Sequence, residues 1–513
     1  MPSALDELKA RLGRIADLDR AAALLAWDER TGMPPGGAQA RAEQLATLAE
    51  LGHELTVSDE LAELIERAAG EVEGLPYESD EASLVRVARR DVERARRVPT
   101  ELSGELARAA SLAENAWVRA RAESDFAAFR PYLERNVELR RRYAECFAPY
   151  EHPYDPLLDD YEPGLTTAEL EPVLARLRDG LRPLVERYAG AGEDDSFLRG
   201  EFPADRQRAL VERILASLPI PADERRLDPT PHPFLTAIAP TDLRITTRYD
   251  EDNLSMSVWS LLHECGHAIY ENGIPHELSR TPLGRAVSLA FHESQSRMLE
   301  NWVGRSRPYL AYLLPLMREA FPEQLGDIGL DRLYRAANRV ERSLIRVDAD
   351  EVTYNLHIIL RFELEVALVR GELEVAELPD AWNQRMWDYL GVEVPDDASG
   401  VLQDVHWAAG AFGYFPTYAL GNVVALQIWE RARADLPELD ARLERGDCAE
   451  LGAWQRERLY RHGAKFTPAE TIERVTGGPL DPAPLMRYLA GKYGELYRLG
   501  TIPAPMNRSE VDS

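Results

Sequence analysis

A short run near the middle of the chain places two histidines and a glutamate where they could bind and use a metal ion. The run His263-Glu264-Cys265-Gly266-His267 has the pattern H-E-x-x-H. Residues four apart lie on one face of a helix, so His263 and His267 can present two imidazoles to one ion. Glu264 is rotated by about 100° from His263, where a base can take a proton from a water activated by the metal.

A third candidate ligand follows on the next predicted helix. Glu293 lies thirty residues beyond His263, within Phe291-His292-Glu293-Ser294-Gln295-Ser296-Arg297. A catalytic zinc site takes three protein ligands and leaves one position open, and two histidines with a glutamate are one such set. His292 competes for this place but points elsewhere on the same helix. Since a chance match would lack a third ligand, the spacing predicts a catalytic metal site.

Most of the chain carries the pattern of amphipathic helices, which must position these residues. Apolar side chains recur at helical spacing from Leu5 to Leu18, and after a turn at 33–37 the pattern resumes at Ala38. A helical pattern also returns at about Ser255 and is expected to continue to the end of the chain, with Asn272-Gly273 ending the helix of the metal motif. Between these regions, the spacing predicts helices near 57–73, 81–97, 101–123, 126–149 and 167–190.

A break at 228–250 contains the clearest strand of the sequence. Four prolines between 229 and 240 exclude a helix there. From Asp242 to Tyr249, apolar and polar residues alternate with the period of an amphipathic strand. We therefore predict a mostly α fold with a small β-sheet beside the H-E-x-x-H helix. We predict a single domain over 1–513, with a helical N-terminal part at 1–225 and a catalytic part at 226–513.

The composition fits a globular protein and argues against several partners. The 513 residues carry a formal net charge of −28, with an isoelectric point of about 4.9, and so acidic a surface repels the phosphates of nucleic acids. Positive charge comes almost entirely from arginine, which fits either a GC-rich genome or adaptation to high salt. Three cysteines give no disulfide framework. Neither a signal peptide nor a membrane-spanning run is visible, so we predict a cytoplasmic protein without a membrane partner.

Several further motifs follow one another along nearly the whole chain. Those nearest the metal motif are His232-Pro233-Phe234, Asp242-Leu243-Arg244-Ile245-Thr246, His292-Glu293-Ser294-Gln295, Ile345-Arg346-Val347-Asp348-Ala349-Asp350 and Gly400-Val401-Leu402-Gln403-Asp404-Val405-His406-Trp407. Outside them lie Trp27-Asp28, Met33-Pro34-Pro35-Gly36 and Tyr154-Asp155-Pro156-Leu157-Leu158-Asp159. In type and order these motifs resemble those of the carboxypeptidase Taq family of metallocarboxypeptidases, with no departure at a motif position.

The resemblance implies a large helical body with a deep active-site groove and the neurolysin-like architecture. It also implies an enzyme that removes single residues from the C-termini of peptides with broad specificity. Members of the family are usually homodimers and usually use zinc, for which Co²⁺ or Mn²⁺ can substitute. Carried onto this chain, the resemblance assigns metal binding to His263, His267 and Glu293 and the role of catalytic base to Glu264.

A carboxypeptidase must recognise a free carboxylate, which arginine does best through two parallel charge-assisted hydrogen bonds. Arg346 is the first candidate and Arg244 the second. The alternative for Arg346 is a helix salt bridge with Asp350, four residues on. Arg244 and Asp242 would flank the groove if their strand offered its edge to the substrate backbone. His232 would close the far end of the groove, unless it is only a turn residue before proline.

Polar side chains late in the chain are further candidates for binding the substrate. His406, Tyr414 and Tyr418 can donate to the scissile carbonyl or the oxyanion, and the sequence leaves the choice among them open. Gln403 and Asp404 can orient His406 or a metal ligand. The alternative for each tyrosine is a place in the core with a satisfied hydroxyl.

Two other functions fit part of the pattern. An oligopeptidase like neurolysin would use the same metal chemistry on internal bonds, and dependence on a free C-terminal carboxylate separates it from a carboxypeptidase. A helical scaffold with a structural zinc would need a closed, cysteine-rich site. Only Cys265 lies in the metal motif, and it faces away from the two histidines. Loss of hydrolysis with a retained fold in Glu264→Gln would exclude the scaffold.

Overall fold

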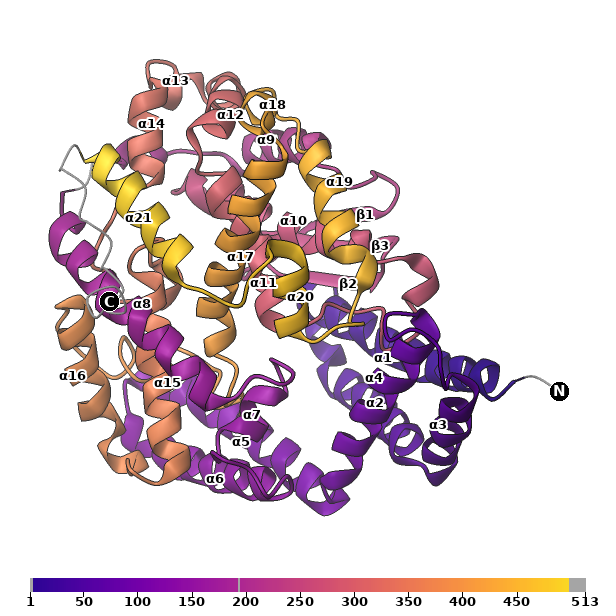
Figure 1. Ribbon diagram of the computed structural model, residues 1–513. Coiled ribbons are helices and arrows are strands. Elements are labelled where there is room, and N and C mark those ends of the chain that lie inside the picture. The colour runs from indigo at the N-terminus through magenta and orange to yellow at the C-terminus, as the bar shows by residue number, and fades with distance from the viewer. Residues whose placement is uncertain (1–2, 192–193, 498–513) are drawn as a thin grey trace, which may run out of the picture. The chain divides into compact units, whose positions relative to one another are not determined.

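Helices make up most of the chain in the computed structural model, which describes residues 3–191 and 194–497 (Figure 1). The chain divides into two units, each drawn from three segments. Unit 1 comprises Met1–Arg97, Asp195–Tyr334 and Ile428–Gly478. Unit 2 comprises Val98–Asp194, Arg335–Gln427 and Pro479–Ser513. The mostly α fold with a small sheet is confirmed, while the single domain with its division at 225/226 stays a prediction.

The N-terminal helices of unit 1 form where the apolar periodicity predicts them. They are α1 (Ala4–Thr31), α2 (Ala38–Val57), α3 (Asp59–Glu71) and α4 (Asp80–Arg97), with the 3-10 turn η1 (Pro35–Gly37) before α2. Ser58 caps α3 by accepting a hydrogen bond from the backbone N–H of Leu61. Leu61, Leu64, Ile65 and Ala68 of α3 are all buried, at the spacing of one helix face. Local spacing therefore suffices to place these elements.

A three-stranded sheet lies beside the helix of the metal motif in unit 1. Its strands are β1 (Arg225–Pro229), β2 (Leu235–Ala239) and β3 (Asp242–Thr247), in the order β1-β3-β2. β3 is parallel to β1 and antiparallel to β2. The expectation that this strand offers its edge to a substrate is therefore wrong, because both edges of β3 are already hydrogen-bonded to neighbouring strands. The sequence shows the period of β3 but not its place in the sheet.

Helix α10 (Leu254–Gly273) carries the metal motif and packs against the sheet (Figure 1). Asn253 caps its start by accepting from the backbone N–H of Ser255, and the helix ends at Gly273 as predicted. α10 also meets α11 (Leu289–Arg297) at very close range. A Cβ atom on Gly266 would lie only 2.3 Å from the backbone oxygen of Gln295. Residue 266 must therefore be glycine, because α11 approaches α10 too closely there for a side chain.

Of the remaining elements of unit 1, η4 (Met298–Val303), α9 (Ala204–Ser217), α19 (Ala449–Arg458) and η7 (Tyr460–His462) contact α10. η4 is a π-helix that continues α11 without a break. The others are η2 (Ser196–Leu198), η3 (His276–Leu278), α12 (Arg307–Ala320), α13 (Pro322–Leu325), α14 (Leu330–Ala337), α18 (Leu439–Leu443) and α20 (Pro468–Thr476). π-helical turns are rare and occur often at functional sites, which makes η4 notable beside the metal motif.

Unit 2 is built around α15 (Tyr354–Arg370), which is buried on almost every side. It packs against α6 (Phe126–Glu145), α8 (Thr167–Tyr188) and α16 (Leu378–Leu390) (Figure 1). Other elements of this unit are α5 (Thr100–Glu123), α7 (Asp155–Asp159), η5 (Arg346–Asp348), η6 (Val375–Glu377), the start of α17 (Pro416–Asp435) and α21 (Ala483–Leu496). A helix whose whole circumference is buried must also bury its charged residues, and these need partners inside the protein.

The expected helical pattern from Ser255 to the end of the chain is interrupted at several places, the longest of them at 391–415, and residues 498–513 lie outside the part that the structure describes. Residues 391–415 contain no helix, and this segment connects α16 to α17. Pro395 and three glycines with positive φ, Gly391, Gly410 and Gly413, explain the interruption. The segment matters because it carries Gln403, His406 and Tyr414, three of the predicted site residues.

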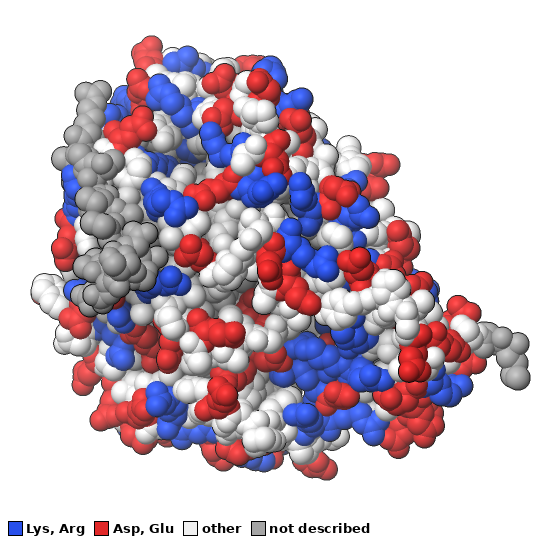
Figure 2. Space-filling model, in the orientation of Figure 1, with Lys and Arg blue, Asp and Glu red and all other residues white. Residues whose placement is uncertain are grey.

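Figure 2 shows Asp and Glu interleaved with Lys and Arg over the face in view. Many of them form ion pairs between neighbouring helices, such as Arg89 with Glu66 at 2.9 Å and Arg135 with Glu105 at 2.5 Å. In the part of the chain that the structure describes, no helix is both long and apolar enough to cross a membrane.

Candidate functional site

Helices α10 and α11 bring the three predicted metal ligands to one point. Nε2 of His263 lies 3.6 Å from Oε2 of Glu293, and Nε2 of His267 lies 3.5 Å from the same oxygen. One ligand atom from each of the three residues lies within 4.8 Å of both others. Glu264 follows His263 on the same helix and is buried, with 6% of its surface exposed. The structure therefore assembles the cluster that the H-E-x-x-H spacing predicts.

The separation of these atoms fits a tetrahedral metal ion. Bonds of about 2.1 Å from a tetrahedral ion to nitrogen or oxygen place two ligands about 3.4 Å apart. The two measured separations, 3.6 and 3.5 Å, are close to that value. Both imidazoles turn Nε2 toward the carboxylate, because each Nδ1 has another partner. The donor set and its geometry both suit a catalytic zinc site.

A second ring of polar groups holds the ligands in place. Nδ1 of His263 lies 2.9 Å from Oε2 of Glu300, and Nδ1 of His267 lies 3.0 Å from the backbone oxygen of His292. Since both partners accept, each Nδ1 carries the proton and leaves Nε2 free for a metal. Arg297 donates to Glu293 at 2.7 Å and to Glu300 at 3.3 Å. These contacts fix the tautomers and orientations of the ligands.

The charges around the ligands favour a cation. Burial disfavours the charged form of His263, but Glu293 and Glu300 outweigh it and raise its pKa to about 9. Burial raises the pKa of Glu264 to about 7, a value at which a carboxylate can both accept and return a proton near neutral pH. Burial also acts on Glu300, but Arg297 and His263 outweigh it and hold its pKa well below the usual range. Glu300 is therefore ionised at neutral pH.

Two neighbours of the cluster behave as the sequence predicts. His292 turns away from the ligands, because its Nε2 pairs with Glu271 at 3.0 Å while its ring stacks on His267. Cys265 is fully buried and is not part of the cluster of possible ligands among the described residues. Burial raises the pKa of its thiol, which keeps it protonated. Neither residue competes for the metal position.

Glu300→Gln should weaken the binding of a divalent metal such as Zn²⁺ about 10- to 100-fold, because the neutral amide no longer stabilises His263 as a ligand. Competition with a chromophoric chelator measures the metal dissociation constant directly. Glu271→Gln is the matched control, since Glu271 pairs with His292 rather than with a ligand. Equal losses in both variants would show that the effect is only the removal of one nearby negative charge.

Three predicted residues lie on the sheet or in the turn between two of its strands. Arg244 forms a bidentate pair with Asp242, with Nε–Oδ1 at 2.5 Å and Nη2–Oδ2 at 2.9 Å. Its guanidinium also lies over the ring of Trp27, at 4.9 Å from the centroid. His232 is exposed in the turn between β1 and β2. The two charged side chains thus satisfy each other, and any role of this trio in binding substrate stays a prediction.

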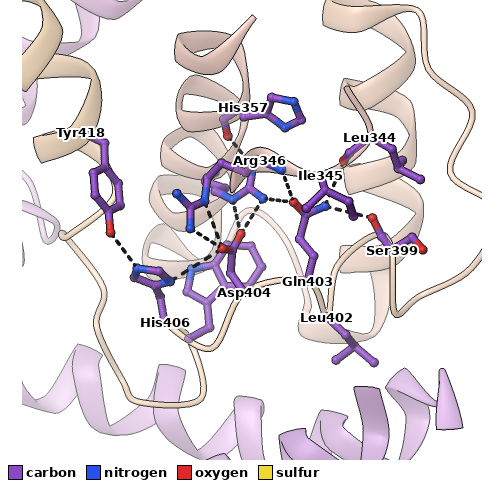
Figure 3. A network of polar contacts seen from close by, with 12 residues as sticks. Leu344, Ile345, Arg346, His357, Ser399, Leu402, Gln403, Asp404, His406 and Tyr418 are labelled. Atoms are coloured by element: carbon purple, nitrogen blue, oxygen red, sulfur yellow. Dashed lines mark hydrogen bonds and ion pairs between the residues drawn. The ribbon is translucent and has the colours of Figure 1, made fainter. Parts of the chain in front are cut away.

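A buried network in unit 2 contains most of the other predicted residues (Figure 3). Arg346 donates through Nε and Nη2 to Oδ1 of Asp404, at 3.0 and 2.7 Å, and through Nη1 to the hydroxyl of Tyr354 at 3.2 Å. The alternative salt bridge between Arg346 and Asp350 is wrong. Asp350 instead accepts from backbone N–H groups and from the hydroxyl of Thr353. The short 3-10 turn η5 takes Arg346 out of the helical register that the alternative needed.

Asp404 is shared by two arginines. Arg361, which is fully buried, donates to its Oδ2 through Nη2 at 2.5 Å and through Nε at 2.8 Å. Burial opposes ionisation of Asp404, but Arg361 and Arg346 outweigh burial and hold its pKa well below the usual range. Two guanidinium groups therefore share one bonded carboxylate, and the cluster attracts an anion.

The remaining predicted residues line the same network. Oε1 of Gln403 accepts from the backbone N–H of Arg346 at 2.9 Å and from Arg361 at 2.8 Å, so this side chain links the backbone of Arg346 to the side chain of Arg361. Nε2 of His406 lies 3.4 Å from the hydroxyl of Tyr418 (Figure 3). The ring of Tyr414 lies 5.3 Å from those of His406 and Tyr418. Burial, with help from both arginines, lowers the pKa of His406 to about 4, so its ring is neutral at neutral pH.

Comparison with known proteins agrees with these motifs. Residues 7–493 match the family described as carboxypeptidase Taq (M32) metallopeptidase. The chain belongs to this family. It is 46% identical to thermostable carboxypeptidase 1 of Thermus thermophilus over 490 residues, which cover 93% of this chain and 95% of the relative. It is 41% identical to carboxypeptidase 1 of Bacillus subtilis over 490 residues, 95% of this chain and 97% of the relative.

A solved structure has the same fold. The M32 carboxypeptidase of Deinococcus radiodurans is 41% identical and superimposes with a TM-score of 0.93, covering 97% of this chain and all of that one. The resemblance inferred from the motifs is thereby confirmed, and the chain is a metallocarboxypeptidase of the M32 family. Whether the fold is also neurolysin-like stays a prediction.

Sequence reasoning missed several residues that support the site of this metallocarboxypeptidase. Arg297 and Glu300 follow Glu293 by four and seven residues, a spacing that places all three on one helix face. That spacing could have predicted that Arg297 and Glu300 lie beside the metal ligand. Arg361 and Glu365 were also missed, although charged residues in a helix that is otherwise apolar all round must be buried with partners.

Acid should destabilise this metallocarboxypeptidase partly through His357 of the buried network. Burial, with Arg361 and Arg346 nearby, lowers its pKa to about 3, whereas an unfolded chain protonates near its ordinary pKa of 6.5. Below that pH the unfolded chain binds a proton that the folded protein does not, so the free energy of unfolding falls, by about 2 kcal/mol at pH 5.

His357→Gln should flatten this dependence, since the amide can still donate to the backbone oxygen of Ser343, now 3.1 Å from Nε2 of the histidine. Urea unfolding at pH 7.5 and pH 5 measures the change. His53→Gln, at a half-buried histidine of α2, serves as the control. An unchanged difference between the two pH values in His357→Gln would contradict the expectation.

Proposed function

We propose that this metallocarboxypeptidase releases single C-terminal amino acids from peptides, with broad specificity and with zinc as its metal. The observation that carries the proposal is the convergence of His263, His267 and Glu293 on one point, with Glu264 next to them on α10. Co²⁺ and Mn²⁺ are further metals that a site of two histidines and a carboxylate can accept. The family and the names of the relatives support the same reaction.

Glu264 moves the proton in this reaction. His263, His267 and Glu293 would hold the metal ion, which would supply Lewis-acid activation of a water and of the scissile carbonyl. Glu264 takes a proton from the attacking water and delivers it to the nitrogen of the leaving amino acid. Its burial supports both steps, because a carboxyl whose pKa is near 7 is a base strong enough to accept and an acid strong enough to donate.

Arg346 recognises the terminal carboxylate of the peptide in this proposal. Its support is the charge of the network, in which Arg346 and Arg361 share one carboxylate, Asp404. Arg244 is the second candidate, although its pairing with Asp242 satisfies it. His232 and Asp242 are proposed to border the bound peptide, and Gln403 to hold the backbone of Arg346 in place.

The group of His406, Tyr414 and Tyr418 is proposed to supply the donor for the oxyanion. A neutral imidazole can donate from one ring nitrogen, and the lowered pKa of His406 keeps it in that form. Its proximity to Tyr418 at 3.4 Å allows the two to donate to one oxygen.

We also propose that the enzyme is a cytoplasmic homodimer that binds neither nucleic acid nor membranes. The net charge of −28 supports the first exclusion, because it repels phosphate backbones. The dimer follows from the usual state of the family.

A matched pair of peptides tests the proposal. The zinc-loaded enzyme is incubated with one peptide that has a free C-terminus and with the same sequence amidated, and mass spectrometry follows the products. We expect only the free peptide to be shortened, one residue at a time. Internal cleavage of both peptides at similar rates would leave the metal chemistry standing and replace the carboxypeptidase by an oligopeptidase.

A further inference from the structure

One segment of unit 2, residues 403–413, carries His406 and Asp404 and is called here the 403–413 loop. Two residues one turn apart on α15 bind both of its ends. Arg361 donates to Asp404 at 2.5 Å and to Gln403 at 2.8 Å, at the start of the loop. Glu365 accepts from the indole N–H of Trp407 at 2.7 Å and from the backbone N–H of Gly413 at 3.1 Å. α15 therefore acts as a rigid support for a segment that has no regular structure of its own.

Tyr154 adds a second support on the far side of Glu365. Its hydroxyl donates to Oε2 of Glu365 at 2.5 Å, and both side chains are fully buried. Gly413 packs against the same part of unit 2, where a Cβ atom would lie 2.3 Å from the backbone oxygen of Leu157. The motif that begins at Tyr154 is prominent in the sequence and lies far along the chain from the loop. In the structure, it packs on the 403–413 loop.

Glu365 is a costly residue for a merely structural role. Burial raises its pKa to about 7, even though Tyr154, Gly413 and Trp407 all donate to it. It forms no direct ion pair among the described residues, and Arg361, one turn earlier on α15, offsets only part of the cost of burying the carboxylate, so Glu365 is expensive compared with an apolar side chain. Glu365 provides an acceptor for three donors, two of them on the 403–413 loop (Trp407 and Gly413) and the third on Tyr154.

We propose that Glu365 is a positioning residue that fixes the 403–413 loop. It thereby holds His406 and the Asp404–Arg346 pair in the positions from which they bind the terminal part of the peptide with its carboxylate. Trp407 is the direct neighbour of His406, and its indole is the group that Glu365 holds. Movement of this indole would shift the backbone on which His406 and Asp404 sit. The inference rests on the proposed role of Arg346 in carboxylate recognition.

Glu365→Gln and Tyr154→Phe test this role. In Glu365→Gln, an amide NH₂ replaces one acceptor, so the N–H of either Trp407 or Gly413 loses its partner. In Tyr154→Phe the carboxylate keeps its two loop donors but loses its anchor, while the ring still packs on Phe362. Tyr188→Phe is the matched control, because Tyr188 is equally buried and its hydroxyl bonds to nothing among the described residues.

We expect KM for a peptide with a free C-terminus to rise about tenfold in Glu365→Gln and several-fold in Tyr154→Phe. We expect kcat to stay within about twofold, and zinc affinity and the Tyr188→Phe enzyme to be unchanged. A merely structural role would lower the fraction of active enzyme, and therefore kcat, at constant KM. That pattern would overturn the inference, as would an unchanged KM in both variants.

The wild-type enzyme separates this inference from the proposed function. If it shortens amidated and free peptides equally, the carboxylate role of Arg346 fails and the inference falls with it. If it requires the free carboxylate while both variants keep the wild-type KM, the proposed function stands and only the positioning role of Glu365 is overturned.

Discussion

Glu264→Gln should lower kcat about a thousandfold while the protein keeps its fold and its metal. The amide has the size of the carboxylate but cannot take a proton from the attacking water, and loss of a general base costs about 10²- to 10⁴-fold. None of the three ligands changes, because Glu264 is not in the cluster formed by His263, His267 and Glu293. Initial rates on a peptide with a free C-terminus, measured together with the metal content of the same sample, check both halves of the expectation.

Glu293→Gln provides the contrast that identifies the role of Glu264. It removes a ligand and leaves both imidazoles without the carboxylate that lies 3.6 and 3.5 Å from them, so metal and activity should be lost together. Glu264→Gln should lose activity alone. If Glu264→Gln kept more than about a tenth of kcat, another group would be the base and the assignment would be wrong. If both variants lost the metal, Glu264 would belong to the binding set.

The metal ligands could be predicted because their positions depend on local spacing. His263 and His267 are one helical turn apart, and the structure places them on one face of α10. Glu293 could be predicted as the third ligand on the single assumption that its helix, α11, packs against α10. The structure adds the reason why it returns so closely, since Gly266 has no side chain to keep the backbone at Gln295 away.

The surroundings of the unit 2 residues could not be predicted in the same way. Asp404 and Trp407 lie about forty residues beyond their partners Arg361 and Glu365, in a segment without periodicity. Periodicity reports which face of an element is buried, but it does not say which distant loop covers that face. The place of β3 in its sheet could not be predicted either, because side chains alternate in the same way in an edge strand and in a central strand.

Replacing Arg346 should abolish the preference for a free C-terminus. We expect Arg346→Met to lower kcat/KM on the free peptide about a hundredfold, because the carboxylate of the bound substrate would be buried without its charged partner. The residual rate on the amidated peptide, which is far below that on the free peptide in the wild-type enzyme, should change less than about twofold. Arg346→Lys should recover only part of the loss, since an ammonium keeps the charge but not the planar pair of donors.

The structure explains why this variant should still fold. Asp404 is bound by two arginines, so in Arg346→Met it keeps its pair with Arg361, at 2.5 Å. The change removes one positive charge from a cluster with two guanidinium groups and one bonded carboxylate, so it takes away the excess that attracts an anion. Arg244→Met is the matched comparison, because Arg244 also pairs with an aspartate, Asp242. If Arg244→Met lost the preference for the free peptide and Arg346→Met kept it, the carboxylate would be read on the sheet, and the buried network would serve stability alone.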